Sequence, residues 1–330
     1  MLALFRNNES FTLFLLAVYI AVLRLPAMMG WVAPPAGEDA AGGWLYRVLL
    51  SPVSLAPTVS AIAAAGLVLV QAFAVYRLSD KYRLMEERSW LPGALYGLAA
   101  SCVPDFLFLS PALLAVTIVP LGLWRLFSVY RRPLAFSIVF DIAFGFVVAT
   151  FVYPPSFWFV VIGFLGLFSL RSFSRREQIV YLVGLIAPLV ILQAVLLWFE
   201  QSGVFWQTQW ANIFAWPRPK WPETTSMRLA IGVLAGVLLV VALGFNLYYY
   251  KRSIQVKKYI DILYWFLLGG TLSAFFRPGS TLDGFLLCMP MAGIFLSYLF
   301  QTSRNNPLME LLHLALFAAA LLTSSYSRLF

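Results

Sequence analysis

The sequence predicts an all-α fold, a polytopic transmembrane helical bundle with about eleven spans. Of its 330 residues, 62% are hydrophobic and only 11% are charged, whereas an average soluble domain has about half and about a quarter. The apolar residues gather in long stretches, and the basic residues lie mainly in every second connection between them. Together these observations predict one integral membrane domain over residues 1–330, with no soluble domain beside it.

Eleven apolar stretches are each interpreted as a spanning helix, because about 20 helical residues cross the hydrocarbon core of a bilayer. They cover residues 11–30, 57–76, 91–109, 111–130, 134–152, 156–171, 178–199, 229–250, 259–277, 282–301 and 308–325. The first stretch is too long for the apolar part of a signal peptide, and its end at Ala27 to Gly30 is a poor cleavage site. We therefore expect it to be a retained span.

Lysine and arginine residues indicate the orientation of the spans. With a cytoplasmic N-terminus, the inner connections carry 16 of these residues and the outer segments carry six. This bias follows the positive-inside rule, by which cytoplasmic loops are enriched in Lys and Arg. It predicts a multi-pass protein of the bacterial inner membrane, with its N-terminus in the cytoplasm and its C-terminus in the periplasm.

Composition and motifs exclude several classes of function. The net charge of +9 is spread between apolar stretches, whereas nucleic-acid binding needs a clustered basic face. One histidine, His313, and two cysteines in apolar runs, Cys102 and Cys288, are too few for haem held by two histidines, a histidine-rich iron centre or the usual zinc site. The Walker A and dinucleotide glycine motifs are absent as well. A divalent cation held by carboxylates is the cofactor that stays open.

The first outer segment, residues 31–56, has two parts. Prolines and glycines in residues 31–44 disfavour regular structure and place two adjacent acids, Glu38 and Asp39, just outside the first span. The following LYRVLLSPVSLAP is too short to cross the bilayer. It predicts an interfacial amphipathic piece with Arg47 toward the lipid headgroups.

This order of parts resembles the C-type (GT-C) superfamily of membrane glycosyltransferases. Those proteins have a first span, an outer loop with an acidic residue or pair, juxtamembrane helices and then short-looped spans. The resemblance covers roughly the first 200 residues and implies a polyprenyl-phosphate-linked sugar donor, with Glu38 and Asp39 at the positions of the base or metal ligand. This chain is shorter than most such enzymes and lacks their large soluble domain, and solvated loop charges are the alternative interpretation of the two acids.

The run from Leu123 to Phe173 is similar to a group of integral membrane proteins from Bacteroidota. In that group an arginine-rich inner loop precedes a span that begins near an FD pair and ends near a YP-type turn, as at Asp141 and Tyr153 here. Some members carry the label of a carotene-cleaving oxygenase. Those iron enzymes use four histidines, so the resemblance implies a topology and no mechanism.

Charged residues within spans need a partner, a cavity or a function, because their insertion costs a few kcal/mol. Arg24 and Asp105 both lie toward the outer ends of their spans. A cavity shared with the loop acids would offer Arg24 to a phosphate and Asp105 to acid–base chemistry; a structural Arg24–Asp105 pair is the alternative. Asp141, nearer mid-span, suggests either a proton or cation site in a transporter or a pair with a neighbouring helix. Asp283 lies close to a predicted helix end, which places it in the headgroup layer.

The second outer segment, residues 200–228, is rich in tryptophan. It carries Trp206, Trp210, Trp216 and Trp221, with Arg218 and Lys220 between the last two. Tryptophans at this depth form an interfacial belt or a platform for a sugar or headgroup, with the two basic residues attracting phosphate.

Two functional hypotheses from different classes follow. The first is an envelope glycosyltransferase of GT-C type. Its catalytic candidates are Glu38, Asp39 and Asp105, and its substrate-binding candidates are Arg24, Arg47, Trp216, Arg218 and Lys220. The second is a non-catalytic subunit or scaffold that binds other inner-membrane proteins, and a small-solute transporter is a further alternative. Each requires contact with membrane lipid, and polyprenyl phosphate is the lipid that the first implies.

Overall fold

The computed structural model describes residues 2–6, 11–35, 41–49, 56–213, 225–249, 252–277, 281–302 and 307–329, and these ranges contain no strand. The prediction of an all-α fold is confirmed. In chain order the α-helices and the short 3-10 helices (η) are α1 (Leu2–Arg6), α2 (Phe11–Met28), α3 (Trp44–Leu49), α4 (Pro57–Lys81), α5 (Leu91–Ala99), η2 (Pro104–Leu107), α6 (Pro111–Ser128), α7 (Phe136–Val152), η3 (Pro154–Ser156), α8 (Phe157–Leu170), α9 (Arg175–Trp198), α10 (Ser202–Ile213), α11 (Thr225–Leu243), α12 (Phe245–Tyr249), α13 (Ile254–Phe275), η4 (Asp283–Cys288), α14 (Met289–Thr302) and α15 (Pro307–Leu329).

The lengths and composition of these helices are those of a multi-pass membrane protein. Within the described ranges, five helical segments are long and apolar enough to cross a bilayer: Phe11–Met28, Pro57–Lys81, Pro111–Ser128, Arg175–Trp198 and Asp283–Gln301. Shorter apolar helices cover Phe136–Val152, Pro154–Leu170, Met227–Leu243 and Met309–Ser324. The number of eleven spans stays a prediction, because several crossings are shorter than a full bilayer helix.

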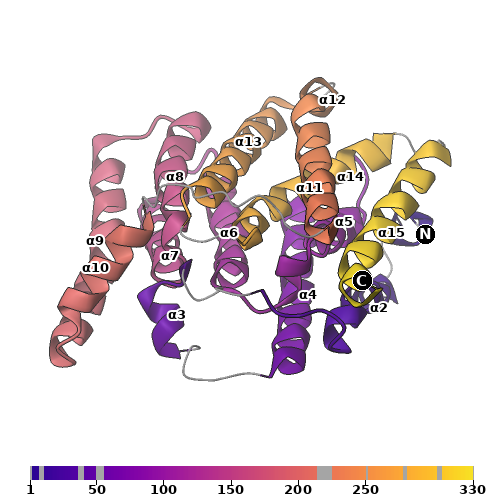
Figure 1. Ribbon diagram of the computed structural model, residues 1–330. Coiled ribbons are helices and arrows are strands. Elements are labelled where there is room, and N and C mark those ends of the chain that lie inside the picture. The colour runs from indigo at the N-terminus through magenta and orange to yellow at the C-terminus, as the bar shows by residue number, and fades with distance from the viewer. Residues whose placement is uncertain are drawn as a thin grey trace.

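The helices form two groups on either side of α13, as Figure 1 shows. In one group α7 packs against α6, α8 and α9, and in the other α5 packs against α4 and α14. Helix α13 contacts α8 of the first group and α14 of the second. The second group also joins the two ends of the chain, because α2 packs against α15 and the Tyr19 hydroxyl lies 3.0 Å from Nε2 of His313.

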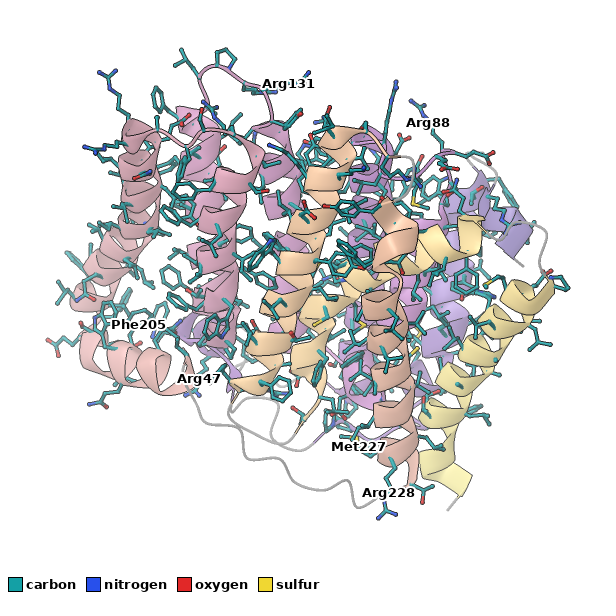
Figure 2. The ribbon with its side chains drawn as sticks, turned by 90° about the horizontal axis from the view of Figure 1, so that it is seen from above. Arg47, Arg88, Arg131, Phe205, Met227 and Arg228 are labelled. Carbon is teal, nitrogen blue, oxygen red and sulfur yellow. The ribbon has the colours of Figure 1, made fainter. Side chains whose placement is uncertain are left out.

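Arginines from the two predicted sides of the membrane lie at opposite edges of the bundle. Figure 2 shows Arg88 and Arg131 at one edge and Arg47 and Arg228 at the other. The first two belong to connections predicted to be cytoplasmic, and the last two to the outer segments. These four arginines thus lie apart, as the positive-inside prediction requires of them.

Two predicted spans, 91–109 and 282–301, are not continuous α-helices. Helix α5 ends at Ala99 and the chain continues through η2, while the other crossing begins with η4 before α14. A proline lies at the start of the new helix in each case, Pro104 in η2 and Pro290 in α14. Proline lacks the N–H that would continue the hydrogen bonds of a preceding helix, so these boundaries interrupt the predicted spans.

Arg24 compensates for the break after α5. Its Nη2 donates to the carbonyls of Ala100 and Phe106, both at 2.8 Å, and its Nη1 donates to the Leu107 carbonyl at 3.2 Å. The last carbonyls of a helix have no donor within the helix, and the bilayer supplies no water to replace one. Arg24, whose side chain has no exposed surface, therefore supplies donors that the broken crossing lacks.

Replacement of Arg24 by methionine should destabilise the protein by about 3 kcal/mol or more, since each buried carbonyl left without a donor costs about 1–3 kcal/mol. The measurement is the melting temperature of the protein in detergent. Arg228→Met is the matched control, because Arg228 is exposed at the same edge as Arg47. Equal melting temperatures for the two variants would refute the structural role of Arg24.

Candidate functional site

The sequence suggested two roles for Arg24 and Asp105: lining a cavity together with the loop acids, or forming an ion pair with each other. The structure contains no such ion pair. Arg24 donates to backbone carbonyls, whereas Oδ2 of Asp105 accepts a hydrogen bond from the backbone N–H of Leu282 at 2.8 Å. Asp105 thus joins η2 to the segment that precedes η4. The expectation of a direct Arg24–Asp105 pair is wrong, and the reason is that the α5–η2 break presents backbone carbonyls to the guanidinium.

The segment beside Asp105 holds a second buried pair of charges. Arg277 and Asp283 form an ion pair, and their side chains are only 2% and 1% exposed. Thr281 closes this pair, because its hydroxyl donates to Oδ1 of Asp283 at 2.6 Å and its carbonyl accepts from Nη1 of Arg277. Asp105 and Tyr153 both interact electrostatically with Arg277 and Asp283. We call Asp105, Tyr153, Arg277, Thr281 and Asp283 the outer ionic cluster.

Four polar atoms of the outer ionic cluster have no hydrogen-bond partner among the described residues: Nε and Nη2 of Arg277, Oδ2 of Asp283 and the hydroxyl of Tyr153. Such atoms are rare in folded proteins and mark strain, function or an unobserved ligand or water. Asp283 lies at the start of η4, as expected of a residue near a helix end, but its carboxylate is enclosed by protein. Its depth relative to the headgroup layer stays a prediction. The signal available in the sequence was the short spacing of opposite charges in RPGSTLDG.

An apolar groove of about 220 Å³ lies between α7, α8, α9 and α10. It reaches the outer end of α7, because Thr150 and Phe151 line it one or two residues before that helix ends. The other lining residues are Val147, Phe157, Val160, Leu185, Leu189, Phe205, Trp206, Gln209 and Ile213. No charged side chain is among them, so the groove suits a hydrocarbon chain better than a polar solute.

Helix α3 lies against this groove. The Trp44 ring meets Phe205 edge to face with centroids 6.3 Å apart, and the Trp44 indole N–H donates to Oε1 of Gln201 at 3.2 Å. The backbone N–H of Gly43 donates to the Val152 carbonyl at 2.8 Å. These contacts fix the first outer segment to α7 and α10.

Arg47 follows Trp44 by one helical turn and is exposed at the same edge of the bundle. Its Nε donates to the Gly42 carbonyl at 3.1 Å. The structure thus has a short helix here with an exposed Arg47, and the interfacial position of this helix stays a prediction. Helix α3 contacts the groove through Trp44 and Phe205 and carries a cation one turn further along.

The structure places the predicted site residues in two regions. Arg24 and Asp105 lie around η2, and Arg47 lies on α3 beside α7 and α10. The remaining candidates, Glu38, Asp39, Trp216, Arg218 and Lys220, lie outside the described residues. Among the described residues, no group of three or more His, Cys, Asp or Glu side chains is arranged to hold a metal ion.

Asp141, the acid on which the transporter hypothesis depended, has a partner on the neighbouring helix. Its Oδ2 lies 3.4 Å from Nη2 of Arg125 on α6. The prediction of a pair with a neighbouring helix is confirmed.

Gln209 is a residue that the sequence analysis did not single out. It is 4% exposed, and its Nε2 donates to the Thr150 carbonyl at 2.5 Å. The second outer segment contains α10, and the interfacial belt or tryptophan platform expected there stays a prediction. An amide among the tryptophans of FWQTQW was the available signal.

Comparison with known proteins gives one solved structure to report. No family model matches the chain, and no curated protein matches it. A crystal structure of ArnT from Cupriavidus metallidurans bound to undecaprenyl phosphate aligns with a TM-score of 0.49 and 15% identity, over 90% of this chain and 58% of that one. The chain thus spans less than two thirds of that protein. The fold class rests on the helices themselves: this chain is an all-α polytopic membrane protein.

Proposed function

We propose that the chain is an envelope glycosyltransferase of GT-C type that holds a polyprenyl-phosphate-linked sugar donor at its outer face. The observation that carries this proposal is the uncharged groove between α7, α9 and α10, bordered by the interfacial helix that bears Arg47. A long hydrocarbon tail gains free energy in such a groove in proportion to its buried apolar area.

The membrane setting supports a lipid as the occupant. Ile186 and Val190 of α9 are 56% and 59% exposed, as expected for a helix face in contact with acyl chains. The groove is lined by Leu185 and Leu189 of the same helix, so a lipid reaches it without leaving the bilayer. Arg47 then provides a guanidinium suited to a phosphate at the level of the headgroups.

The transfer chemistry needs a base and a leaving group. We assign the base to Glu38 or Asp39, which either acts directly or holds a divalent cation, and the sugar platform to Trp216 with Arg218 and Lys220. The base accepts the proton of an acceptor hydroxyl, whose oxygen forms the new bond to the anomeric carbon. The lipid phosphate leaves with the electrons of the broken carbon–oxygen bond.

Leu189→Trp should reduce lipid binding by at least tenfold. The indole fills part of the groove, and displacement of two buried CH₂ groups of the lipid costs about 1.6 kcal/mol. Undecaprenyl phosphate is a suitable probe, with bound lipid per chain measured by native mass spectrometry.

The matched control is Val190→Trp, which adds the same side chain at the next position, where the residue is 59% exposed. We expect this variant to bind as the wild type does. If the two tryptophan variants retain the same amount of lipid, the groove is not the lipid site.

Combined replacement Glu38→Gln and Asp39→Asn should lower sugar transfer by about 10²–10⁴-fold, the usual contribution of a general base, while lipid binding is unchanged. Transfer is measured with the glycosylated lipid in membranes that contain the overexpressed protein. Glu200→Gln is the control, since Glu200 is another exposed acid in an outer segment. Undiminished transfer in the double variant contradicts the enzymatic proposal.

A scaffold is the second candidate function, and one feature of α11 favours it. A Cβ added at Gly232 or at Gly236 would meet no atom within 4 Å. Small residues four apart allow close approach of another helix in membranes, and no described part of this chain uses this face. Loss of a co-purifying membrane protein from a Gly232→Leu variant, together with a silent double acid variant, would favour the scaffold over the enzyme.

A further inference from the structure

Gln209 leaves one polar atom unpaired beside the groove. Its Nε2 is bound to the Thr150 carbonyl at 2.5 Å, but its Oε1 has no hydrogen-bond partner although the side chain is 96% buried. Buried polar atoms of this kind are nearly always hydrogen-bonded in native proteins. The described part of the chain therefore leaves an acceptor unfilled next to a groove that is otherwise apolar.

Two donor side chains of the described residues near the groove, Trp206 and Gln193, are already engaged. The Trp206 indole N–H donates to Oε1 of Gln193 at 3.0 Å, and Nε2 of Gln193 donates to the Ser202 hydroxyl at 2.7 Å. A rotated Gln209 amide would not solve the problem, because two acceptor oxygens, its own and that of Thr150, would then face each other. Oε1 of Gln209 is thus a free acceptor, and its hydrogen-bond donor has to come from outside the described residues.

The position of Gln209 indicates which part of a lipid it meets. Thr150 lies two residues before the outer end of α7, and α10 belongs to the outer segment next to α3. The carbonyl of Thr150 thus fixes Gln209 at the headgroup end of the groove. An isoprenoid tail has no hydrogen-bond donor, and neither does a phosphate in its ionised form, whereas a sugar carries several hydroxyls.

We infer that Gln209 determines specificity by accepting a hydrogen bond from a hydroxyl of the sugar on the lipid phosphate. The inference rests on the proposed function, because it places the tail of the same ligand in the groove. It implies that the chain binds the glycosylated lipid more tightly than the bare lipid phosphate. A site built to bond a hydroxyl discriminates strongly against an analogue that lacks it, because the buried acceptor is then left unpaired.

The test compares two ligands on three proteins. The ligands are undecaprenyl phosphate and the same lipid phosphate carrying one hexose, and the proteins are the full-length wild type, Gln209→Met and Gln193→Met. Methionine nearly preserves the shape of glutamine but removes its donor and acceptor. Gln193 is the matched control because both ends of its amide are paired within the protein.

We expect the wild type and Gln193→Met to bind the glycosylated lipid at least tenfold more tightly than the bare one, and Gln209→Met to bind the two within a factor of about two. Melting temperatures establish that each variant is folded. If Gln209→Met does not fold, the wild type alone tests the inference. Equal affinities of the wild type for the glycosylated and the bare lipid would overturn it.

The remaining outcomes are also decisive. The wild type could bind the two lipids equally well while Leu189→Trp weakens the binding of both. That result would overturn the role of Gln209 and leave the proposed lipid site intact. Absence of binding of either lipid, with no effect of Leu189→Trp, would overturn both. Equal competition by phosphatidylglycerol, whose headgroup also carries hydroxyls, would show that the donor comes from an ordinary phospholipid, and the sugar assignment would fall.

Discussion

Every polar group that lies within a bilayer needs a partner from the chain or from a ligand, because hydrocarbon offers none. Arg24 meets this requirement at the outer end of α2, where it donates to three carbonyls released by the break between α5 and η2. The break could not persist without these donors, and it is the break that brings η2 against the segment before η4. There Asp105 accepts from Leu282 and completes the outer ionic cluster.

Partners and surroundings together separate structural from functional polar groups in this part of the fold. Arg24 donates to backbone carbonyls through both terminal nitrogens and only its Nε is unpaired among the described residues, which favours a structural role. Gln209 has a partner at one end of its amide only, beside an uncharged groove, and this favours a ligand. Arg47 is exposed on the helix that Trp44 holds against Phe205 of the groove, and this favours the proposed contact with a headgroup.

Much of the fold followed from local properties of the sequence. The apolar stretches predicted the helical bundle, and the distribution of arginine predicted the separation of Arg88 and Arg131 from Arg47 and Arg228 (Figure 2). Both features depend on the composition of single segments. The break after α5 was signalled only by Pro104 and Asp105 within an otherwise apolar stretch, and the donors that stabilise it come from Arg24, 76 to 83 residues away. The ion pair of Asp283 and the burial of Gln209 were missed for a related reason, because burial by remote segments is not encoded in neighbouring residues.

The central claim is that a lipid occupies the groove between α7, α9 and α10 with its head beside Gln209. Electron cryo-microscopy of the full chain in nanodiscs made from native membranes tests this most directly. The account predicts elongated density along Leu185 and Leu189 that ends in a polar group within hydrogen-bonding distance of Oε1 of Gln209. A groove that is empty, or filled by side chains of the protein itself, would contradict it.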